Sequence, residues 1–333
     1  MNIINDTHSA SPAVIDNGRE VVVDNPVWHT HPHQKLSILV PSYKDDPEPL
    51  LTALEKCYAV VDIELIVYDD GGGNDLLIEK LSSCAADLSY PIRIVSASKN
   101  TGRSCARNRL LHYARSDWVL LLDADMIPDK PDFISNYIFE IEKSAAPKLV
   151  VGGFSLKQAS TAREFAIHRW QAEQSECVPA EIRSTEPGRY VFTSNVLVHA
   201  SVFEHTPFDE SFSGWGWEDV DWGLRVAQAF PIIHLDNTAT HLGLDRIEDL
   251  LKKYGGSGPN FRKAVEKHPD TLQTTNLYVI SNKLKPLPFK PLAKKALSLV
   301  MTIQLLPIPI KMRGNALKLW RAIVCAEALN EKR

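Results

Sequence analysis

The feature that most limits the fold of this chain is a repeated alternation of short apolar runs and helix-like stretches between residues 36 and 125. We interpret the apolar runs as strands: LSILVPS (36–42), ELIVYDD (64–70), IRIVSAS (92–98) and WVLLLDAD (118–125). Strands that alternate with helices form parallel sheets covered by helices on both faces. We therefore predict an α/β fold with a mostly parallel sheet, whose ligands bind at the carboxyl ends of the strands.

Polar residues follow each predicted strand. They are Pro41 and Tyr43 after the first strand, Asp69 and Asp70 after the second, Asn100 and Gly102 after the third, and Asp123 and Asp125 after the fourth. Because these strand ends share one edge of the sheet, we expect the residues to line one crevice. Carboxylates beside an apolar core are expected to face a cation, a ligand or water. The chain has neither a GxGxxG fingerprint after the first strand nor a GxxxxGK[ST] loop, which weakens a dinucleotide or P-loop interpretation.

These segments carry a family resemblance. SILVPSY, VYDDGGG, NTGRSCARN and LLLDADMIP, in this order, resemble the nucleotide-sugar half of glycosyltransferase family 2, whose fold is called GT-A. FDESFSGWGWEDVDWGLRV (208–226) resembles the acceptor-side segment of family 7 galactosyltransferases and of bacterial chondroitin-type polymerases. The resemblance implies a Rossmann-like GT-A domain at 35–255, with a nucleotide-sugar half at 35–130 and an acceptor or catalytic half at 150–245.

The resemblance assigns the donor site. The family's strand-two aspartate accepts a hydrogen bond from a uracil ring, which implies this role for Asp69 and Asp70, although Asp-Gly is also a common turn signal. Pro41 and Tyr43 would border the base. Arg107, on the helix after Asn100 and Gly102, is a candidate for the diphosphate because a guanidinium suits phosphate geometry, but it could equally be a surface arginine.

A divalent cation would neutralise the departing nucleoside diphosphate. Oxygen ligands with one imidazole suit Mn²⁺ or Mg²⁺, so we expect Asp125 to be the first ligand and Asp123 to lie near the ribose or the metal. In family 7 a histidine downstream of the WGxED segment completes the metal shell, and His241 has the corresponding position here. The alternative is that His241 is a packed or capping side chain.

The acidic motif GWGWEDVD supplies the acceptor side. By resemblance Asp219 is the general base that deprotonates the acceptor hydroxyl, and Glu218 holds an acceptor hydroxyl. Trp215 and Trp217 would stack on sugar rings, on a glycine-flanked turn that closes over bound donor. The alternative is an ordinary helix start, since Asp and Glu are favoured in a first turn. The resemblance also places Asn195 near the donor sugar or the acceptor.

Two flanking segments complete the expected domain organisation. Residues 1–34 are expected to form an N-terminal leader. This leader lacks the basic start and the continuous apolar run of a signal peptide. Residues 256–333 are expected to form a basic, partly amphipathic helical extension, and GGSGP (255–259) is expected to be a hinge or a mobile lid. From residue 283 onward there are eleven Lys or Arg against two Glu, with an apolar run too short to span a bilayer. This extension either lies on the inner leaflet of the cytoplasmic membrane or packs on the catalytic domain.

The composition limits partners and compartment. A net charge of -4 gives no general attraction to nucleic acid, so we expect no nucleic-acid partner. Five cysteines without paired spacing indicate free thiols in the cytoplasm.

The leading function hypothesis is a metal-dependent inverting glycosyltransferase. It would move a hexose or N-acetylhexosamine, of galactose, N-acetylgalactosamine or N-acetylglucosamine type, from a UDP-sugar to a glycan or lipid-linked oligosaccharide in bacterial surface polysaccharide or glycolipid synthesis. The alternatives are a retaining transferase of N-acetylgalactosamine type and an inactive sugar- or nucleotide-binding protein. Retaining relatives have a WGxEN segment that lacks the second acid, which is present here as Asp219.

Overall fold

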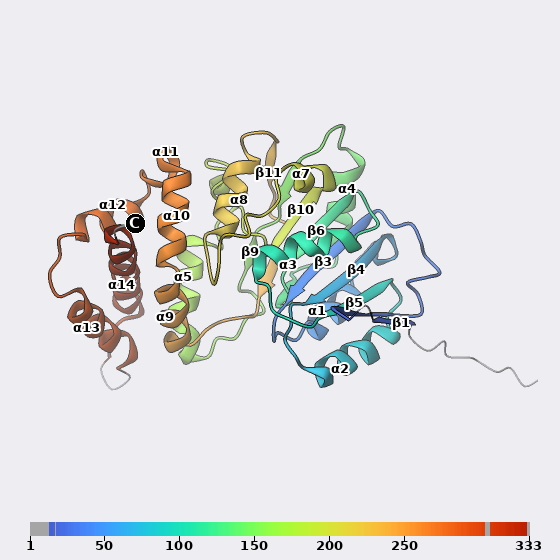
Figure 1. The fold of residues 1–333 in the computed structure, drawn as a ribbon, viewed down its shortest axis with the longest axis horizontal. Helices are drawn as coiled ribbons and strands as arrows, with labels where there is room; N and C mark the ends of the chain where they lie inside the picture. The colour runs from blue at the N-terminus through green and yellow to red at the C-terminus, as the bar shows by residue number, and fades with distance from the viewer. Residues whose placement is uncertain (1–12, 17, 304–306, 332–333) are drawn as a thin grey trace, which may run out of the picture.

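The computed structural model describes residues 13–16, 18–303 and 307–331. An α/β region comes first along the chain, and a group of helices follows it at the other end of the molecule (Figure 1). The observed order of strands and helices matches the predicted alternation between residues 36 and 125.

The main sheet has nine strands within the described residues. Across the sheet they are β1 (Ala13–Asp16), β2 (Glu20–Asp24), β5 (Ile92–Ala97), β4 (Ile63–Asp69), β3 (Leu36–Ser42), β6 (Trp118–Leu122), β10 (Asn195–His199), β8 (Leu149–Val151) and β11 (Ile232–His234). The central strands β5, β4, β3 and β6 are parallel. β10 runs antiparallel between β6 and β8, so the sheet joins both halves of the expected catalytic domain.

Different helices cover the two faces of this sheet. Side chains of β3 alternate between the faces: Ile38 and Val40 pack in a core with α1, α2 and α4, whereas Leu39 packs in a second core with α3, α7 and α8. These helices are α1 (Glu48–Leu54), α2 (Asp75–Ala86), α3 (Arg103–Leu110), α4 (Phe133–Glu142), α7 (Ala200–His205) and α8 (Glu218–Val226). Because both faces are covered, all seven residues of β4 are buried, as expected for an internal parallel strand.

A small second sheet extends the domain beside the end of β6. Its strands are β7 (Met126–Pro128), β12 (Ala239–His241) and β9 (Phe154–Ser155). Asp129, whose side chain is 1% exposed, accepts hydrogen bonds from the hydroxyls of Ser155, Thr238 and Thr240 and pairs with Lys157. This carboxylate joins all three strands and fixes where β12 delivers His241. Helices α5 (Ala166–Ser175) and α6 (Ala180–Arg183) lie between β9 and β10 in the chain.

The expected leader contributes to the sheet. β1 and β2 lie within residues 1–34, and β2 pairs antiparallel with β5. Glu20 on β2 is buried and receives two hydrogen bonds from Arg109, at 2.9 and 2.7 Å, and one from Tyr113. Residues 20–24 therefore form a strand of the main sheet between β1 and β5, which corrects the expectation of a separate leader there. The first twelve residues of the leader lie outside the described residues.

The carboxyl-terminal region is helical, as predicted. It comprises α9 (Ile247–Gly256), α10 (Gly258–Lys267), α11 (Pro269–Leu272), α12 (Asn276–Leu284), α13 (Lys290–Thr302) and α14 (Ile310–Asn330). The long helix α14 packs against α13, α12, α10, α9 and α5, so this region is attached to the catalytic domain. Among the described residues, no helix is both long and apolar enough to cross a membrane.

The GGSGP segment is not an open hinge. α9 ends at Gly256 and α10 begins at Gly258, with only Ser257 between them, and Ser257 is 1% exposed. A Cβ on Gly258 would lie 3.1 Å from Ala328 on α14, so this glycine permits close packing of two helices. Gly258 thus serves helix packing, and the buried Ser257 argues against the predicted lid movement.

Candidate active site

Asp69 and Asp70 end β4 and organise the loop after β5. Asp70 is buried and accepts hydrogen bonds from the backbone amides of Thr101 and Gly102, at 2.9 and 2.8 Å, and from the side chain of Asn100. A Cβ on Gly71, whose φ is +70°, would lie 2.3 Å from the Asn100 amide nitrogen. Only glycine fits at position 71, which explains the first glycine of the DDGG sequence. The hydrogen bonds of Asp70 place Asn100 and Gly102 beside the end of β4, at one edge of the sheet.

Asp69 faces the same edge. Its carboxylate accepts the Gly72 amide at 3.1 Å and the Ser96 hydroxyl at 3.3 Å. Burial raises the pKa of Asp69, and these two hydrogen bonds oppose that effect. Tyr43, which is 44% exposed, and the partly buried Pro41 lie at the end of the neighbouring strand β3.

Asp125 forms a pair with His241, as the predicted metal site requires. His241 Nε2 lies 3.1 Å from Asp125 Oδ2, and the two side chains are 25% and 31% exposed. Burial alone would raise the pKa of Asp125, but the hydrogen bond and charge of His241 outweigh it and lower that pKa. Burial alone would lower the pKa of His241, but Asp125, Glu176 and Asp123 outweigh it and raise that pKa. Each side chain of the pair thus favours the charged form of the other.

This pair fits a divalent cation as a carboxylate and an imidazole donor. His241 Nδ1 is buried without a hydrogen-bond partner in the described part of the chain. A Cβ on Gly243 would lie 2.0 Å from Asp125 Oδ2, so a glycine keeps the space beside this oxygen clear. The described residues contain no preformed group of three or more metal-ligating side chains. Two donors are therefore in place, and further positions would be taken by ligand oxygens or water.

Asp123 faces a buried arginine. Arg107 Nη2 donates to Asp123 Oδ1 at 3.1 Å. Burial raises the pKa of Asp123, Arg107 opposes this effect, and the charge of Asp125 adds to it. The expected role of Asp123 at the metal or ribose stays a prediction, because one of its oxygens is already engaged.

Arg107 brings the two acidic motifs together. Its side chain is 3% exposed, and its Nη1 lies 4.0 Å from Glu218 Oε1 and 3.9 Å from Asp219 Oδ1. Burial alone would lower the pKa of Arg107, but Asp123, Asp219 and Glu218 outweigh it and raise that pKa. Acids of LLLDADMIP and GWGWED thus surround one guanidinium.

The burial of Arg107 revises its expected role. A side chain enclosed by three carboxylates is not a surface arginine, and its expected contact with a diphosphate stays a prediction. Arg103, at the start of α3, is 50% exposed and lies 3.8 Å from Glu218. It is the guanidinium that a ligand can reach, and the sequence reasoning missed it because two arginines four residues apart on one helix look equivalent.

Asp45 was also missed. It lies in the loop after β3, and the pKa of its carboxyl is raised by desolvation and by the negative charge of Asp125, with Asp123 adding to the effect. Asp45 therefore belongs to the same acidic edge. The only sequence signal was its position shortly after a strand end.

Glu218 and Asp219 begin α8 in different environments. Glu218 is 5% exposed, and burial together with the charge of Asp219 raises its pKa. Asp219 is 25% exposed and accepts hydrogen bonds from the Thr193 hydroxyl at 2.7 Å and the Thr193 amide at 3.3 Å. Asp219 is thus the more accessible carboxylate and has a fixed orientation. Thr193, which is fully buried, was not identified from the sequence.

Trp215 and Trp217 rest on the carboxyl-terminal helices. Their rings lie 5.2 Å from Tyr254 on α9 and 4.9 Å from Phe261 on α10, respectively. Trp217, the residue before α8, has a φ of 79°, an uncommon conformation for a bulky residue that packing must hold. Both tryptophans remain partly exposed, so sugar stacking stays a prediction.

The turn that carries both tryptophans is hydrogen-bonded to α10. Asn260 on α10 donates to the carbonyls of Ser213 and Gly216, at 2.9 and 3.0 Å. Asp221 pairs with Arg225 at 2.8 Å and also contacts Lys267 and His268. These contacts fix the segment to the helical extension, which argues against the freely closing turn expected from its glycines.

Asn195 is not a ligand-contacting residue. It is 0% exposed, accepts the Tyr137 hydroxyl at 2.6 Å and donates to the carbonyls of Gly153 and Asn237. All of these partners are internal. The expectation that Asn195 contacts donor sugar or acceptor is therefore corrected to a structural role at the start of β10.

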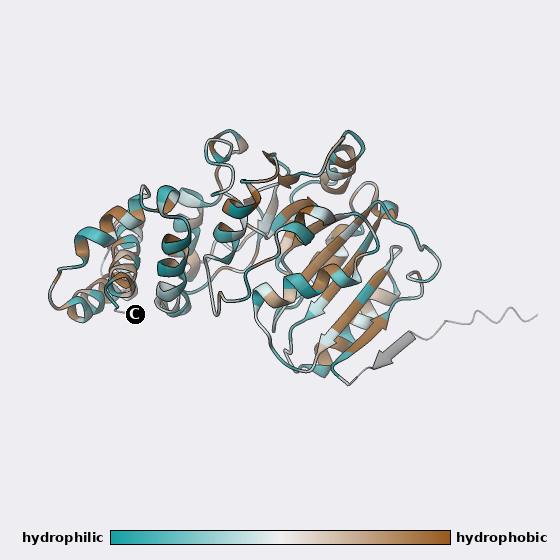
Figure 2. Cartoon of the chain, turned by 45° about the horizontal axis from the view of Figure 1, so that its top comes forward, coloured by the Kyte–Doolittle hydropathy of each residue, from teal (hydrophilic) through white to brown (hydrophobic). Residues whose placement is uncertain are grey.

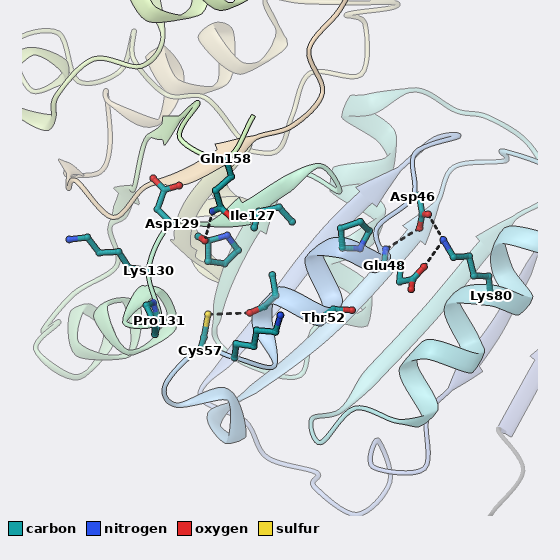
Figure 3. A pocket seen from close by; sticks show the side chains of 14 residues that line it. Asp46, Glu48, Thr52, Cys57, Lys80, Ile127, Asp129, Lys130, Pro131 and Gln158 are labelled. Atoms are coloured by element: carbon teal, nitrogen blue, oxygen red, sulfur yellow. Dashed lines mark hydrogen bonds and ion pairs between the residues drawn. The ribbon is translucent and has the colours of Figure 1, made fainter. Parts of the chain in front are cut away.

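A pocket of about 600 Å³ lies between α1 and β7 (Figure 3). Lys80 pairs there with Asp46 and Glu48, while Ile127 and Gln158 close the opposite wall. None of the predicted site residues lines this pocket, so it does not contribute to the functional assignment.

Comparison with known proteins shows similarity to glycosyltransferases. Residues 37–181 match the model of glycosyl transferase family 2. A hyaluronan synthase of Pasteurella multocida is 27% identical over 232 residues, which cover 59% of this chain and 23% of that protein. An uncharacterized glycosyltransferase, YfnE of Bacillus subtilis strain 168, is 25% identical over 247 residues, covering 59% of this chain and 61% of its own. The chain thus spans less than two thirds of either relative.

Solved structures share the fold. The mannosyltransferase PcManGT from Pyrobaculum calidifontis, in complex with GDP-Man and Mn²⁺, has a TM-score of 0.56 and 15% identity, covering 90% of this chain and 88% of its own. Residues 1–349 of S. aureus TarS have a TM-score of 0.50 and 13% identity, covering 89% of each chain.

The architecture is therefore that of a GT-A glycosyltransferase, as the sequence predicted. More narrowly, residues 37–181 are similar to glycosyl transferase family 2, and both relatives named above are glycosyltransferases or synthases of a glycan. The resemblance of residues 208–226 to family 7 stays a prediction.

Proposed function

We propose that the chain is a metal-dependent, inverting glycosyltransferase that moves a hexose or N-acetylhexosamine from a UDP-sugar to a hydroxyl of a glycan acceptor. The observation that carries this proposal is the arrangement around Arg107, which contacts Asp123 on one side and Asp219 on the other. In this proposal LLLDADMIP contacts the donor and GWGWED contacts the acceptor, within one site. The activity, substrates and partners all belong to this proposal.

The donor side rests on the pair of Asp125 and His241, which would hold Mn²⁺ or Mg²⁺. A cation bound there supplies Lewis-acid stabilisation of the diphosphate as it leaves. Arg103 provides an exposed positive charge at the same edge. Tyr43, Pro41 and the loop organised by Asp70 would border the nucleotide. PcManGT, which shares the fold, is in complex with GDP-Man and Mn²⁺, and this supports a nucleotide-sugar donor and a divalent cation.

The acceptor side rests on Asp219. Its carboxylate takes the proton of the acceptor hydroxyl while that oxygen bonds to the anomeric carbon, on the face opposite the diphosphate. The bond between the anomeric carbon and the diphosphate oxygen breaks, and UDP leaves. An α-linked donor thus gives a β-linked product. Thr193 orients the base, and the buried Glu218, whose pKa is raised, is suited to hold an acceptor hydroxyl.

The proposal places this reaction in the cytoplasm, in the synthesis of a surface polysaccharide or glycolipid. All five cysteines are free, which is typical of a reducing compartment. The acceptor would be a glycan or a lipid-linked oligosaccharide at the inner face of the cytoplasmic membrane.

The test is a screen of UDP-sugars for UDP release and for transfer to glycan acceptors in the presence and absence of Mn²⁺. Asp219→Asn should abolish transfer while UDP binding persists, and Asp125→Ala should weaken Mn²⁺-dependent UDP binding measured by calorimetry. Asp75→Asn, at an exposed aspartate of α2, is the matched control. Wild-type turnover of the Asp219 variant would refute the base assignment, and metal-independent donor binding would refute the cation role.

A further inference from the structure

Helix α13 has apolar side chains on two opposite faces. Leu297, Val300 and Met301 pack into a core shared with α9 and α14. This inward face explains why the helix is attached to the rest of the extension. A surface helix normally presents polar side chains on its other side.

The outward face of α13 departs from that rule. Leu292 and Leu299 are 68% and 57% exposed, and Phe289, immediately before the helix, is 78% exposed. Positions 292, 296 and 299 are three or four residues apart, so they lie on one side of the helix, and Ala296 between the leucines is also exposed. We define the α13 outer face as Phe289, Leu292, Lys295, Ala296 and Leu299.

The described part of the chain leaves this face uncovered. The main packing partners of α13 are α14 and α9, and both meet its inward side. Figure 1 shows α13 at the end of the molecule farthest from β1, beyond the other helices of the extension. A large apolar residue that is exposed alone needs no explanation. Two exposed leucines on one face, with an exposed phenylalanine immediately before the helix, indicate an interaction surface.

The positive charge around this face indicates which class of partner it can bind. Lys295 is exposed within the face, and exposed lysines also lie on α12 and at the start of α14, at Lys283 and Lys311. No ion pair forms at these three lysines within the described residues, whereas Lys294, on the inward side, pairs with Glu327 on α14 at 2.6 Å. From residue 283 to the last residue the chain has eleven Lys or Arg, two Glu and no Asp. A second copy of this surface would bring like charges together, whereas anionic lipid headgroups complement them.

We propose that the α13 outer face docks on an anionic lipid bilayer. Phe289, Leu292 and Leu299 enter the interface between headgroups and acyl chains, and the helix lies along the membrane plane with its lysines among the headgroups. The inference is independent of the proposed transfer reaction, because it uses none of the residues around Arg107. It would hold an enzyme of this type beside lipid-linked acceptors.

The test is co-sedimentation of the full chain with vesicles. One set contains phosphatidylcholine alone, and the other contains phosphatidylcholine with an equal part of phosphatidylglycerol. We expect binding to the anionic vesicles, weakened by added salt, and little binding to the neutral ones. The double variant Leu292→Ser/Leu299→Ser should bind about a hundredfold more weakly, roughly tenfold for each leucine.

Two controls make the result decisive. Leu76→Ser changes a leucine of α2 that is 76% exposed at the other end of the molecule, and it should bind as the wild type does. Lys295→Glu should lose the preference for anionic vesicles while its circular dichroism is unchanged. Equal binding by the Leu292/Leu299 variant and the wild type, or no wild-type binding, would overturn the proposal. Sedimentation velocity that shows a dimer disrupted by the leucine changes, without vesicle binding, would assign the face to a second copy instead.

Discussion

The hydrogen bond between Thr193 and Asp219 permits a sharp test of the acceptor side. Thr193 is fully buried, and its hydroxyl donates to Asp219 Oδ1 at 2.7 Å. Thr193→Val removes this hydroxyl but keeps the branched shape and the backbone hydrogen bond to the same carboxylate. Asp219 would then lose the bond that fixes its orientation toward an incoming hydroxyl.

The size of the effect follows from the type of bond. A hydrogen bond to a charged group contributes about 1.5 to 3 kcal/mol. Each 1.4 kcal/mol corresponds to about a tenfold change in rate, so kcat should fall roughly tenfold to a hundredfold. KM for the donor sugar should change little, because Thr193 contacts the base and none of the residues proposed to bind the nucleotide.

The assay compares wild type, Thr193→Val and Thr193→Ser by UDP release and by transfer to an acceptor. Serine keeps the hydroxyl and should restore most of kcat. Thermal unfolding of the three proteins checks that the fold is unchanged. The reasoning is refuted if the valine variant keeps full kcat, or if its UDP affinity falls in parallel with kcat.

Three further predictions concern contacts that hold the site in place. Asn260→Ala removes both hydrogen bonds below the GWGWED turn, so kcat should fall severalfold with UDP affinity retained, and an unchanged kcat would contradict this. Asp129→Ala leaves three hydroxyls and Lys157 without their shared acceptor, and urea denaturation should show a loss of about 3 kcal/mol. The hydrogen bond from Arg109 lowers the pKa of Glu20 from 4.5 to about 2. The salt bridge between these residues therefore stabilises the fold above pH 4.5, and its contribution is lost as the pH falls toward 2. Glu20→Gln should lower the free energy of unfolding at neutral pH by about 3 kcal/mol and flatten this acid dependence; equal acid sensitivity would contradict it.

The predictable part of the fold is the part with simple periodicity. β3 has the predicted bounds, 36–42, and β4 differs from its prediction by one residue, because uninterrupted apolar runs mark strands that are buried on both faces. The helix expected after Asn100 and Gly102 ends as an α-helix at Leu110 and continues as a short 3-10 turn to Tyr113. Helix ends are set by tertiary packing, which a local pattern does not contain.

The strand EVVVD (20–24) was missed for a related reason. Its neighbours in the chain lack a helical stretch, so it does not continue the alternation that identified the other strands. Its partner β5 is about seventy residues away, and its stability depends on Glu20 meeting Arg109. Such long-range pairs leave no short-range pattern.

The candidate site likewise has a part that the sequence predicts and a part that it does not. The motifs correctly brought Asp125, His241 and Asp219 to one region, because each follows a recognisable strand or precedes a helix. They did not separate Arg107 from Arg103, since burial depends on which acids the fold places around each guanidinium. Thr193 carries no motif, and only its contact with a residue 26 positions later reveals its role.

β10 pairs with both β6 and β8 and so interlocks the two halves of the catalytic domain (Figure 1). The strands of the sheet are largely hydrophobic (Figure 2). A chain cut between α4 and β8 would leave β6 at the margin of the first fragment, with a row of unsatisfied amides and carbonyls along its free side. The second fragment would carry β10 with its complementary row exposed. Each fragment alone should therefore self-associate, whereas co-expression should let the two complement each other around that single strand.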